Sequence, residues 1–262
     1  MVITDVFENP TVKNVVFQIV FPNLFSIENN IGNFQEKIMG EFPDSSLVFR
    51  KQIFFVDAGL TAKLGEPPTI ENNEQMSKKI WSFKSPKNVE LNLSCDSLSI
   101  HSASHKTYNN SKSAYKFRDT IKFVVDNFLA IARIPLITRI GLRYIDECPI
   151  FTKDNKTFSE SFNSAINLGK FDISKVETME FRATVEKEGC NLIYGESLRK
   201  IDDKYKLIMD FDAFANSIKA KDYLETADRL HTVISTEFEQ SIKQPIYEYM
   251  KTKPKSVEED KK

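Results

Sequence analysis

The sequence of 262 residues has few of the residues that mark specialised protein classes. It contains eight glycines, three cysteines and one tryptophan, a composition that excludes collagen-like and glycine-rich repeats. No disulfide framework is expected, because the number of cysteines is odd and the three, Cys95, Cys148 and Cys190, are far apart in the sequence. No apolar run approaches the ~20 residues that span a bilayer, and the N-terminus lacks the basic and apolar regions of a signal peptide. We therefore expect a cytoplasmic protein that does not associate with membranes.

Familiar catalytic motifs are missing as well. The sequence has no G-x-G-x-x-G, no P-loop, no G-x-S-x-G and no H-E-x-x-H. These absences remove the common nucleotide-dependent enzymes, serine hydrolases and zinc proteases. We expect no cofactor and favour a non-catalytic function.

What the sequence does contain is enough apolar material for a core. Hydrophobic residues make up 41% of the chain, and 21 of its residues are phenylalanine, which excludes a disordered chain. The formal net charge is only −1, which argues against strong non-specific binding of DNA.

Periodicity in the first half predicts one strand, one helix, several strands and a long helix. Residues 15–21 alternate as a strand, and Ser26 is the predicted cap of a helix whose apolar face spans 27–38. The further predicted segments are strands at 47–56, 80–83, 89–94 and 98–102, a polar stretch at 61–74 and a helix at 113–133.

The second half repeats this order of elements without visible sequence identity. The predicted segments are a strand at 136–144, a short helix at 157–166, strands at 178–186, 191–196 and 205–211, and a final helix over 222–242. Asp222 and Glu225 have the spacing of a capping box at the start of that helix.

Short turns between successive strands favour antiparallel sheets, so the fold class is predicted as α+β. We expect two halves, residues 1–134 and 135–248, packed as one unit and related by duplication, followed by a disordered charged tail at 249–262. The repeated order resembles the TATA-binding-protein-like fold, in which two halves share one curved sheet. A helix-grip fold is the alternative.

The segment Arg139-Ile140-Gly141-Leu142-Arg143-Tyr144 is the most informative in the chain. In a strand, Arg139, Gly141 and Arg143 share one face. A glycine between two guanidinium groups leaves room for a carboxylate or phosphate, which arginine binds through its planar fork of donors. The alternative is a solvated face on which these arginines pair with Glu180 or Glu186.

Basic residues are concentrated between His101 and Arg143. This segment contains eight basic and two acidic residues, which gives it a local charge of +6 (8 − 2). Tyrosines and a phenylalanine lie between the basic residues. This pattern is typical of a nucleotide or nucleic-acid surface, and also of the solvated face of a helix. We expect Lys116, Arg118 and Lys122 to join the arginine face if the long helix borders it.

Candidate metal ligands are few. Asp210 and Asp212 share a strand face and could hold Mg²⁺, but no third acidic ligand has a recognisable spacing. Cys95, His101 and His105 do not complete a zinc site. We therefore predict no metal site, and we expect His231 to be a packed core histidine.

Several motifs together resemble an uncharacterised protein family that is scattered unevenly among bacteria and archaea. The likeness covers nearly the whole chain, and in place of Asp146 the family usually has Asn. The motifs that carry it are Asn9–Phe17, Phe42-Pro43, Trp81-Ser82-Phe83, Asp96-Ser97-Leu98 and, most strongly, Arg139–Ile145. The resemblance implies no established activity. Its uneven occurrence is typical of mobile genes, including those of antiviral defence.

The sequence as a whole predicts a binding module of a mobile or defence-type system. The expected partner is an anionic small molecule, a nucleic acid or another protein, and a homodimer is one alternative. A metal-dependent nuclease or phosphoryl-transfer enzyme that uses Asp210 and Asp212 is the alternative function.

Overall fold

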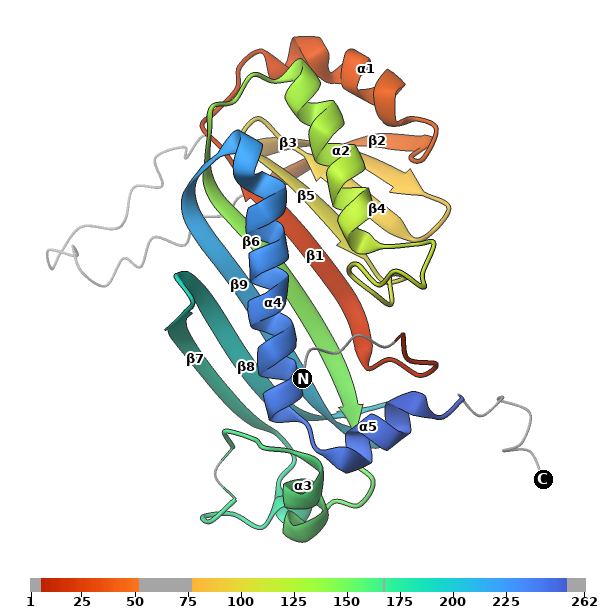
Figure 1. Cartoon of the computed structure of the whole chain (residues 1–262), viewed down its shortest axis with the longest axis vertical. Coiled ribbons are helices and arrows are strands. Elements are labelled where there is room, and N and C mark those ends of the chain that lie inside the picture. Colours follow the sequence, from red (N-terminus) through yellow and green to blue (C-terminus); the bar gives the residue numbers. More distant parts are fainter. Residues whose placement is uncertain (1–5, 52–76, 167, 254–262) are drawn as a thin grey trace, which may run out of the picture.

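The computed structural model describes residues 6–51, 77–166 and 168–253. Its strands are β1 (Val12–Val20), β2 (Asp44–Lys51), β3 (Ser77–Ser85), β4 (Val89–Leu93), β5 (Ser97–Ser102), β6 (Leu136–Pro149), β7 (Met179–Lys187), β8 (Cys190–Ile201) and β9 (Lys204–Lys219). All nine belong to one antiparallel sheet in the order β2-β3-β4-β5-β1-β6-β9-β8-β7 (Figure 1). The predicted α+β class and antiparallel pairing are confirmed.

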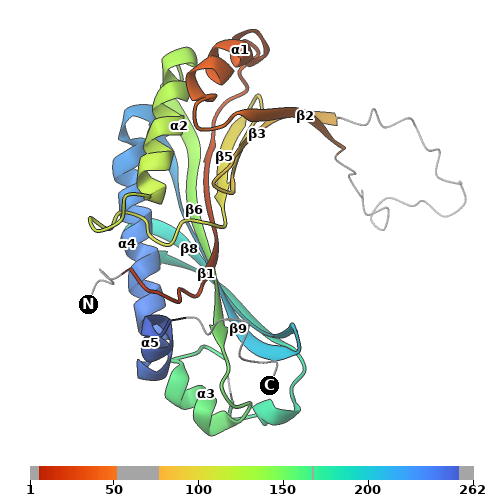
Figure 2. The same ribbon diagram turned by 90° about the vertical axis from the view of Figure 1, so that its right-hand side faces the viewer.

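The helices are α1 (Ile27–Ile38), α2 (Phe117–Ile131), α3 (Asn155–Ser161), α4 (Tyr223–Ser241) and α5 (Gln244–Lys251). Figure 2 shows α1, α2, α4 and α5 on one side of the sheet, whose two ends bend toward the other side. In the described part of the chain that other side carries no long helix, and we call it the open face. None of the described helices is both long and apolar enough to cross a membrane.

The two halves of the chain meet at the centre of the sheet, where β1 pairs with β6. Outward from β1 the order is β5, β4, β3 and β2, and outward from β6 it is β9, β8 and β7. In each direction the last strand of a half lies beside its first strand. The second half has one strand fewer among the described residues.

Alternation along the strands places the core on the helix-covered face. Phe17 of β1 and Leu142 of β6 are opposite each other in the register, and both are fully buried. Phe34 of α1 packs edge-on against Phe83 of β3 and Phe128 of α2, with ring centroids 5.9 and 6.1 Å away. The apolar stripes read from the sequence therefore meet in one core on this face.

Helix α2 begins four residues later than predicted, at Phe117. The backbone N–H groups of Phe117 and Arg118 donate to the carbonyl oxygens of Thr107 and Tyr108, at 3.1 and 3.0 Å. The first backbone N–H groups of α2 are therefore satisfied by the preceding loop, and residues 113–116 belong to that loop and not to the helix.

Ser26 and Asp222 stand at the N-cap positions of α1 and α4, where the sequence placed them, but neither side chain makes a capping hydrogen bond. A 3₁₀ turn at Ala220–Asp222 precedes α4. Asp154 caps α3 by accepting from the backbone N–H of Thr157 at 2.8 Å.

The predicted tail begins too early, because residues 249–251 belong to α5 and Met250 is 1% exposed. Strand β2 ends at Lys51, and the rest of the predicted strand at 47–56, the polar stretch at 61–74 and residues 254–262 lie outside the described residues.

Candidate functional site

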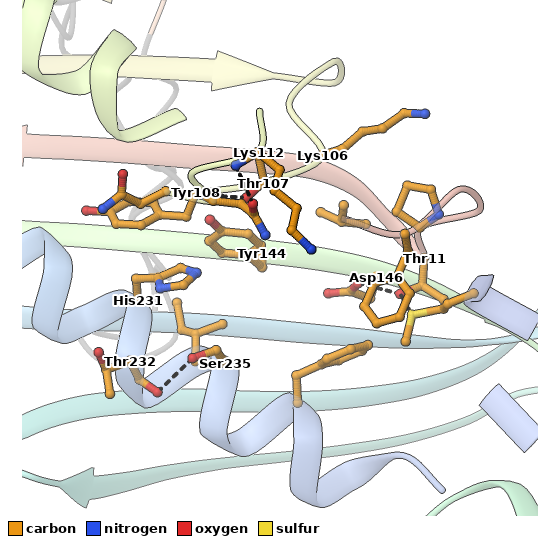
Figure 3. A pocket seen from close by; sticks show the side chains of 18 of the residues that line it. Thr11, Lys106, Thr107, Tyr108, Lys112, Tyr144, Asp146, His231, Thr232 and Ser235 are labelled. Atoms are coloured by element: carbon orange, nitrogen blue, oxygen red, sulfur yellow. Dashed lines mark hydrogen bonds between the residues drawn. The ribbon is translucent and has the colours of Figure 1, made fainter. Parts of the chain in front are cut away.

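A cavity of about 710 Å³ lies on the helix-covered side, between the start of β1, the loop before α2, β6 and α4 (Figure 3). Its volume falls in the range of about 300–1,000 Å³ that is typical of small-molecule sites. Apolar and aromatic side chains make up much of the wall, and a few polar groups converge on the interior. The apolar wall includes Phe7, Val12, Ile234, Phe238 and Met250.

Strand alternation brings Tyr144 and Asp146 to this cavity. Both follow Ile140 and Leu142 on the helix-covered side of β6. Strand β6 lies between β1 and β9 and pairs with both, so its backbone is held on either side. Near the centre of the sheet Ile140 and Leu142 are fully buried, whereas Tyr144 and Asp146 reach the part where the cavity opens.

The hydroxyl group of Tyr144 is buried and has no hydrogen-bond partner in the described part of the chain. Burial, with a smaller contribution from the Asp146 charge, raises the pKa of this phenol above its usual range. The group is therefore a neutral donor and acceptor facing the cavity.

Asp146 is a carboxyl group only 5% exposed. The Thr11 hydroxyl donates to its Oδ1 at 2.8 Å, while Oδ2 accepts no hydrogen bond from any residue that the structure describes. Burial raises its pKa to about 7, although the Thr11 hydrogen bond and Lys13 act in the opposite direction. Near neutral pH the group is poised between its charged and neutral forms.

His231 and Tyr108 form a stacked pair at one end of the cavity, with ring centroids 4.2 Å apart and planes 10° from parallel. Burial lowers the pKa of His231 to about 4, so the imidazole is neutral at physiological pH. Its two ring nitrogens make no hydrogen bond within the described residues. The ring of His231 packs against Tyr108 and Tyr144, in part as predicted from the sequence, but the residue is half-buried and also lines the cavity.

An ion pair between α2 and α4 holds the Tyr108 ring. Arg118 donates to both carboxylate oxygens of Asp228, at 2.7 and 2.8 Å, and the Tyr108 hydroxyl donates to the same carboxylate at 2.8 Å. The charge of Asp228 is therefore compensated at the cavity wall.

Two lysines of the loop before α2, Lys106 and Lys112, lie at the rim of the cavity on the side opposite α4, and the Lys106 side chain extends away from the interior (Figure 3). Lys106 and Lys112 are exposed, and neither has an ion-pair partner among the described residues. Both belong to the basic, aromatic-rich segment that the sequence identified. Asn109 and Ser111 lie between them and add amide and hydroxyl groups.

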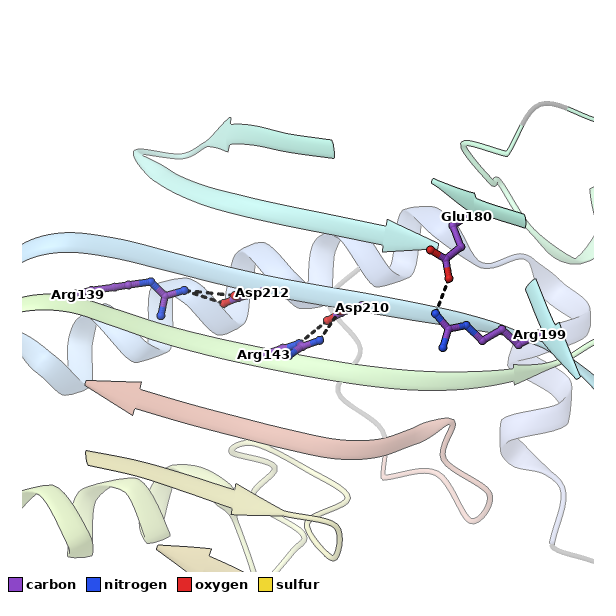
Figure 4. A network of polar contacts seen from close by, with 6 residues as sticks. All are labelled: Arg139, Arg143, Glu180, Arg199, Asp210 and Asp212. Carbon is purple, nitrogen blue, oxygen red and sulfur yellow. Dashed lines mark hydrogen bonds and ion pairs between the residues drawn. The ribbon is translucent and has the colours of Figure 1, made fainter. Parts of the chain in front are cut away.

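The arginines singled out by the sequence lie on the opposite side of the sheet, on the open face (Figure 4). Arg143 donates to both carboxylate oxygens of Asp210 at 2.7 and 2.6 Å. Arg139 contacts Asp212 at 3.2 Å and lies over the ring of Phe214, 4.5 Å from its centroid. The arginines are paired with aspartates of β9, and not with Glu180 or Glu186. Of these, Glu180 pairs with Arg199.

Gly141 makes room for Arg139 itself. A Cβ atom at this position would lie 2.7 Å from Nη1 of Arg139. The missing side chain therefore lets the guanidinium group of Arg139 lie across β6 between Gln18 and Asp212, at 3.3 and 3.2 Å.

The three basic residues of the long helix do not join that face. Lys116 and Arg118 lie at the start of α2, and Lys122 pairs with Asp126 one turn further on. Lys116 lines a second, smaller cavity of about 250 Å³. Arg118 reaches the main cavity only through Asp228. The six predicted site residues are thus divided between the two sides of the sheet.

Among the described residues no cluster of three or more His, Cys, Asp or Glu side chains could hold a metal ion. Asp210 and Asp212 share a face as predicted, but both are bound to arginine. His105 is buried between Ser102 and Thr120 and stacks on Tyr115.

Sequence reasoning assigned no role in a site to Tyr144, Asp146 or His231. One signal for them was present: Asp146 continues the buried phase of Ile140, Leu142 and Tyr144, where a carboxyl group is unusual. Comparisons of the chain with protein-family models, curated proteins and solved structures find no significant match.

Proposed function

We propose that this protein is a non-catalytic binding module that holds a small ligand in the cavity between the sheet and α4. The observation that carries this proposal is the buried hydroxyl of Tyr144, which has no hydrogen-bond partner within residues 6–51, 77–166 and 168–253 and lies at a cavity of about 710 Å³. More than about 90% of buried polar groups in folded proteins have a partner, and one left without a partner costs roughly 1–3 kcal/mol.

The polar groups around the hydroxyl support the same proposal. Oδ2 of Asp146 and both ring nitrogens of His231 also make no hydrogen bond within the described residues. Three neighbouring side chains thus present unused hydrogen-bonding capacity toward one space. A bound ligand with matching donors and acceptors would satisfy all of them together.

The variant Tyr144→Phe tests the proposal. Because the hydroxyl has no partner among the residues that the structure describes, its removal should leave the free energy of unfolding equal to or above that of the wild type. Tyr194→Phe is the matched control, since the Tyr194 hydroxyl donates to buried Glu196 on the same side of the sheet. Its loss should destabilise the protein by roughly 1–3 kcal/mol. Urea unfolding of the three proteins measures both effects.

A thermal-shift screen of small molecules completes the test. A ligand at 100 times its Kd stabilises the folded state by about 2.7 kcal/mol, and the shift should be smaller in Tyr144→Phe. If Tyr144→Phe is destabilised as much as Tyr194→Phe and no compound raises the melting temperature, the cavity is not a ligand site.

The open face is a second candidate surface, favoured by the absence of a long helix over it in the described chain (Figure 2). Binding of an anionic molecule, a nucleic acid or an acidic protein segment there by Arg139, Gly141 and Arg143 remains our prediction from the sequence. Any such partner must compete with Asp210 and Asp212 for the guanidinium groups.

We infer that the fold is of the TATA-binding-protein-like type and arose by duplication. The strand order, which runs outward from β1 and from β6 in the same way, supports this inference. A helix-grip fold, the alternative, would share the long helix α4 against a curved sheet, but it would not require the repeated strand order.

Three other sequence predictions remain proposals. They are membership of the unevenly distributed prokaryotic family, a role in a mobile or antiviral defence system, and formation of a homodimer. A metal-dependent nuclease or phosphoryl-transfer enzyme is the alternative function, and it would require Asp210 and Asp212 to exchange their arginine partners for a metal ion.

A further inference from the structure

The polar groups of the cavity restrict the chemistry of its ligand. A purely apolar ligand, such as an acyl chain, would leave the Tyr144 hydroxyl and Oδ2 of Asp146 without partners. A ligand with its anionic group deep in the cavity would be repelled by the Asp146 carboxylate. The interior therefore favours a neutral group that donates hydrogen bonds to Asp146.

The walls and the loop side add two further restrictions. Tyr108, Tyr144 and His231 form an aromatic wall, with ring centroids 4.2 and 5.9 Å from that of His231, and such walls suit a planar ring. Lys106 and Lys112, which have no anionic partner among the described residues, lie on the accessible loop side. An anionic group there would gain two unused cations.

We propose that the ligand of this cavity is a guanine nucleotide, with its base at Asp146 and Tyr144 and its phosphate at Lys106 and Lys112. Among the common bases, guanine presents two N–H donors, N1–H and N2–H₂, side by side on one edge. This pair matches the two oxygens of a carboxylate, with Oδ2 accepting from the base alone and Oδ1 accepting from both the base and Thr11. The proposal rests on the proposed function, because it names the ligand of the same cavity.

Isothermal titration calorimetry of the full chain with GMP tests this assignment. GMP should bind more tightly than AMP, CMP and UMP, and IMP, which lacks the 2-amino group, should bind more weakly than GMP. Guanosine and inorganic phosphate, which each carry half of the recognised groups, should each bind more weakly than GMP. Equal affinity for all four bases, or no binding of any, overturns the assignment.

Two protein variants separate the two ends of the ligand. Asp146→Asn keeps the shape of the side chain but loses its charge, and should weaken GMP binding roughly 10- to 100-fold. The double variant Lys106→Ala/Lys112→Ala should weaken GMP binding and leave guanosine binding unchanged. Lys204→Ala/Lys221→Ala removes two exposed lysines outside the cavity lining and should change neither. Unchanged GMP affinity in both cavity variants overturns the proposed orientation.

Failure of the nucleotide can be distinguished from failure of the site. One outcome is that GMP does not bind, that Tyr144→Phe is as stable as the wild type, and that another compound raises the melting temperature of the wild type more than that of Tyr144→Phe. In that case only the ligand assignment is wrong. If Tyr144→Phe is destabilised like Tyr194→Phe, the ligand site itself is wrong. A single-stranded RNA pentamer with one guanine distinguishes the source: tighter binding than GMP indicates a nucleotide within a strand, and weaker binding a free nucleotide.

Discussion

At the scale of single residues, the fold changes the protonation of the Asp146 carboxyl group. Its pKa of about 7, against 3.8 for an ordinary aspartate, arises mainly from burial. Between these two pH values the folded protein holds a proton that the unfolded chain has lost. Stability from this group is therefore complete below pH 3.8 and falls as the pH rises to about 7. Lys13, Tyr144 and Cys148 are the other titratable groups that interact with it.

The variant Asp146→Asn should remove this dependence. At pH 8 it should be more stable than the wild type by roughly 1–3 kcal/mol, because the buried charge is gone while Thr11 can still donate to the amide oxygen. At pH 5 the difference should be smaller, because only part of the Asp146 contribution has been lost there. Urea unfolding at both pH values measures the difference.

The comparison must be made between the two proteins at each pH, because two histidines act in the opposite direction. Burial lowers the pKa of His105 and His231 to about 4. The contribution of each histidine to the free energy of unfolding therefore decreases as the pH falls from 6.5 toward 4. These contributions are common to wild type and variant. The same stability difference at pH 5 and pH 8 would contradict the assigned charge of Asp146.

At the scale of elements, β6 presents a different chemistry on each of its two faces. Its helix-covered side carries Tyr144 and Asp146 into the cavity, and its open side carries Arg139 and Arg143. On the open side the arginines pair with Asp210 and Asp212 of the neighbouring β9 (Figure 4). These partly exposed pairs contribute at most about 1 kcal/mol each, so they can be exchanged for another anion at little cost.

Retention on a heparin column tests whether the open face binds anions. Arg139→Ala/Arg143→Ala should elute at lower salt than the wild type. Asp210→Asn/Asp212→Asn, which frees the arginines, should elute at higher salt. Lys204→Ala/Lys221→Ala is the charge-matched control for the first variant. If both lysine and arginine variants elute at the same salt concentration, overall charge explains the retention and the open face has no specific role.

At the scale of the whole molecule, the pairing of β1 with β6 makes one sheet of two halves. Residues of both halves are fully buried on its helix-covered side, and α2 of the first half is joined to α4 of the second by the Arg118–Asp228 pair. Neither half retains its central strand pairing without the other. We therefore expect the described part of the chain to unfold as a single unit.

Trp81, the only tryptophan, lies in β3 of the first half and can report on this cooperativity. Phe211→Ala in β9 of the second half removes a fully buried ring that packs edge-on against Phe238 at 6.2 Å. It should destabilise the protein by about 3–5 kcal/mol. The Trp81 fluorescence transition and the far-ultraviolet circular dichroism transition should move together to lower urea. A shift in circular dichroism alone would show that the halves unfold separately.

Most of the local structure could be predicted from the sequence, and most of the cavity could not. Strand alternation correctly placed Ile140 and Leu142 opposite Arg139 and Arg143, because the period of a strand depends only on local geometry. The tight turns at Glu188-Gly189 and Asp202-Asp203 have positive φ at each residue. The sequence also located the N-cap residues Ser26 and Asp222, but the side-chain hydrogen bonds that usually accompany such caps are absent.

The sequence alone determined the α+β class, the alternating faces of the strands and the basic, aromatic segment that contains Lys106, Tyr108 and Lys112. Which residues meet was decided only by the tertiary structure. Tyr144 and Asp146 share one face of β6, but His231 lies on α4, and no local pattern connects the strand with that helix. The pairing of Arg143 with Asp210 likewise depends on the register between β6 and β9. Such contacts join residues that are distant in the chain, so their energies are absent from any local pattern.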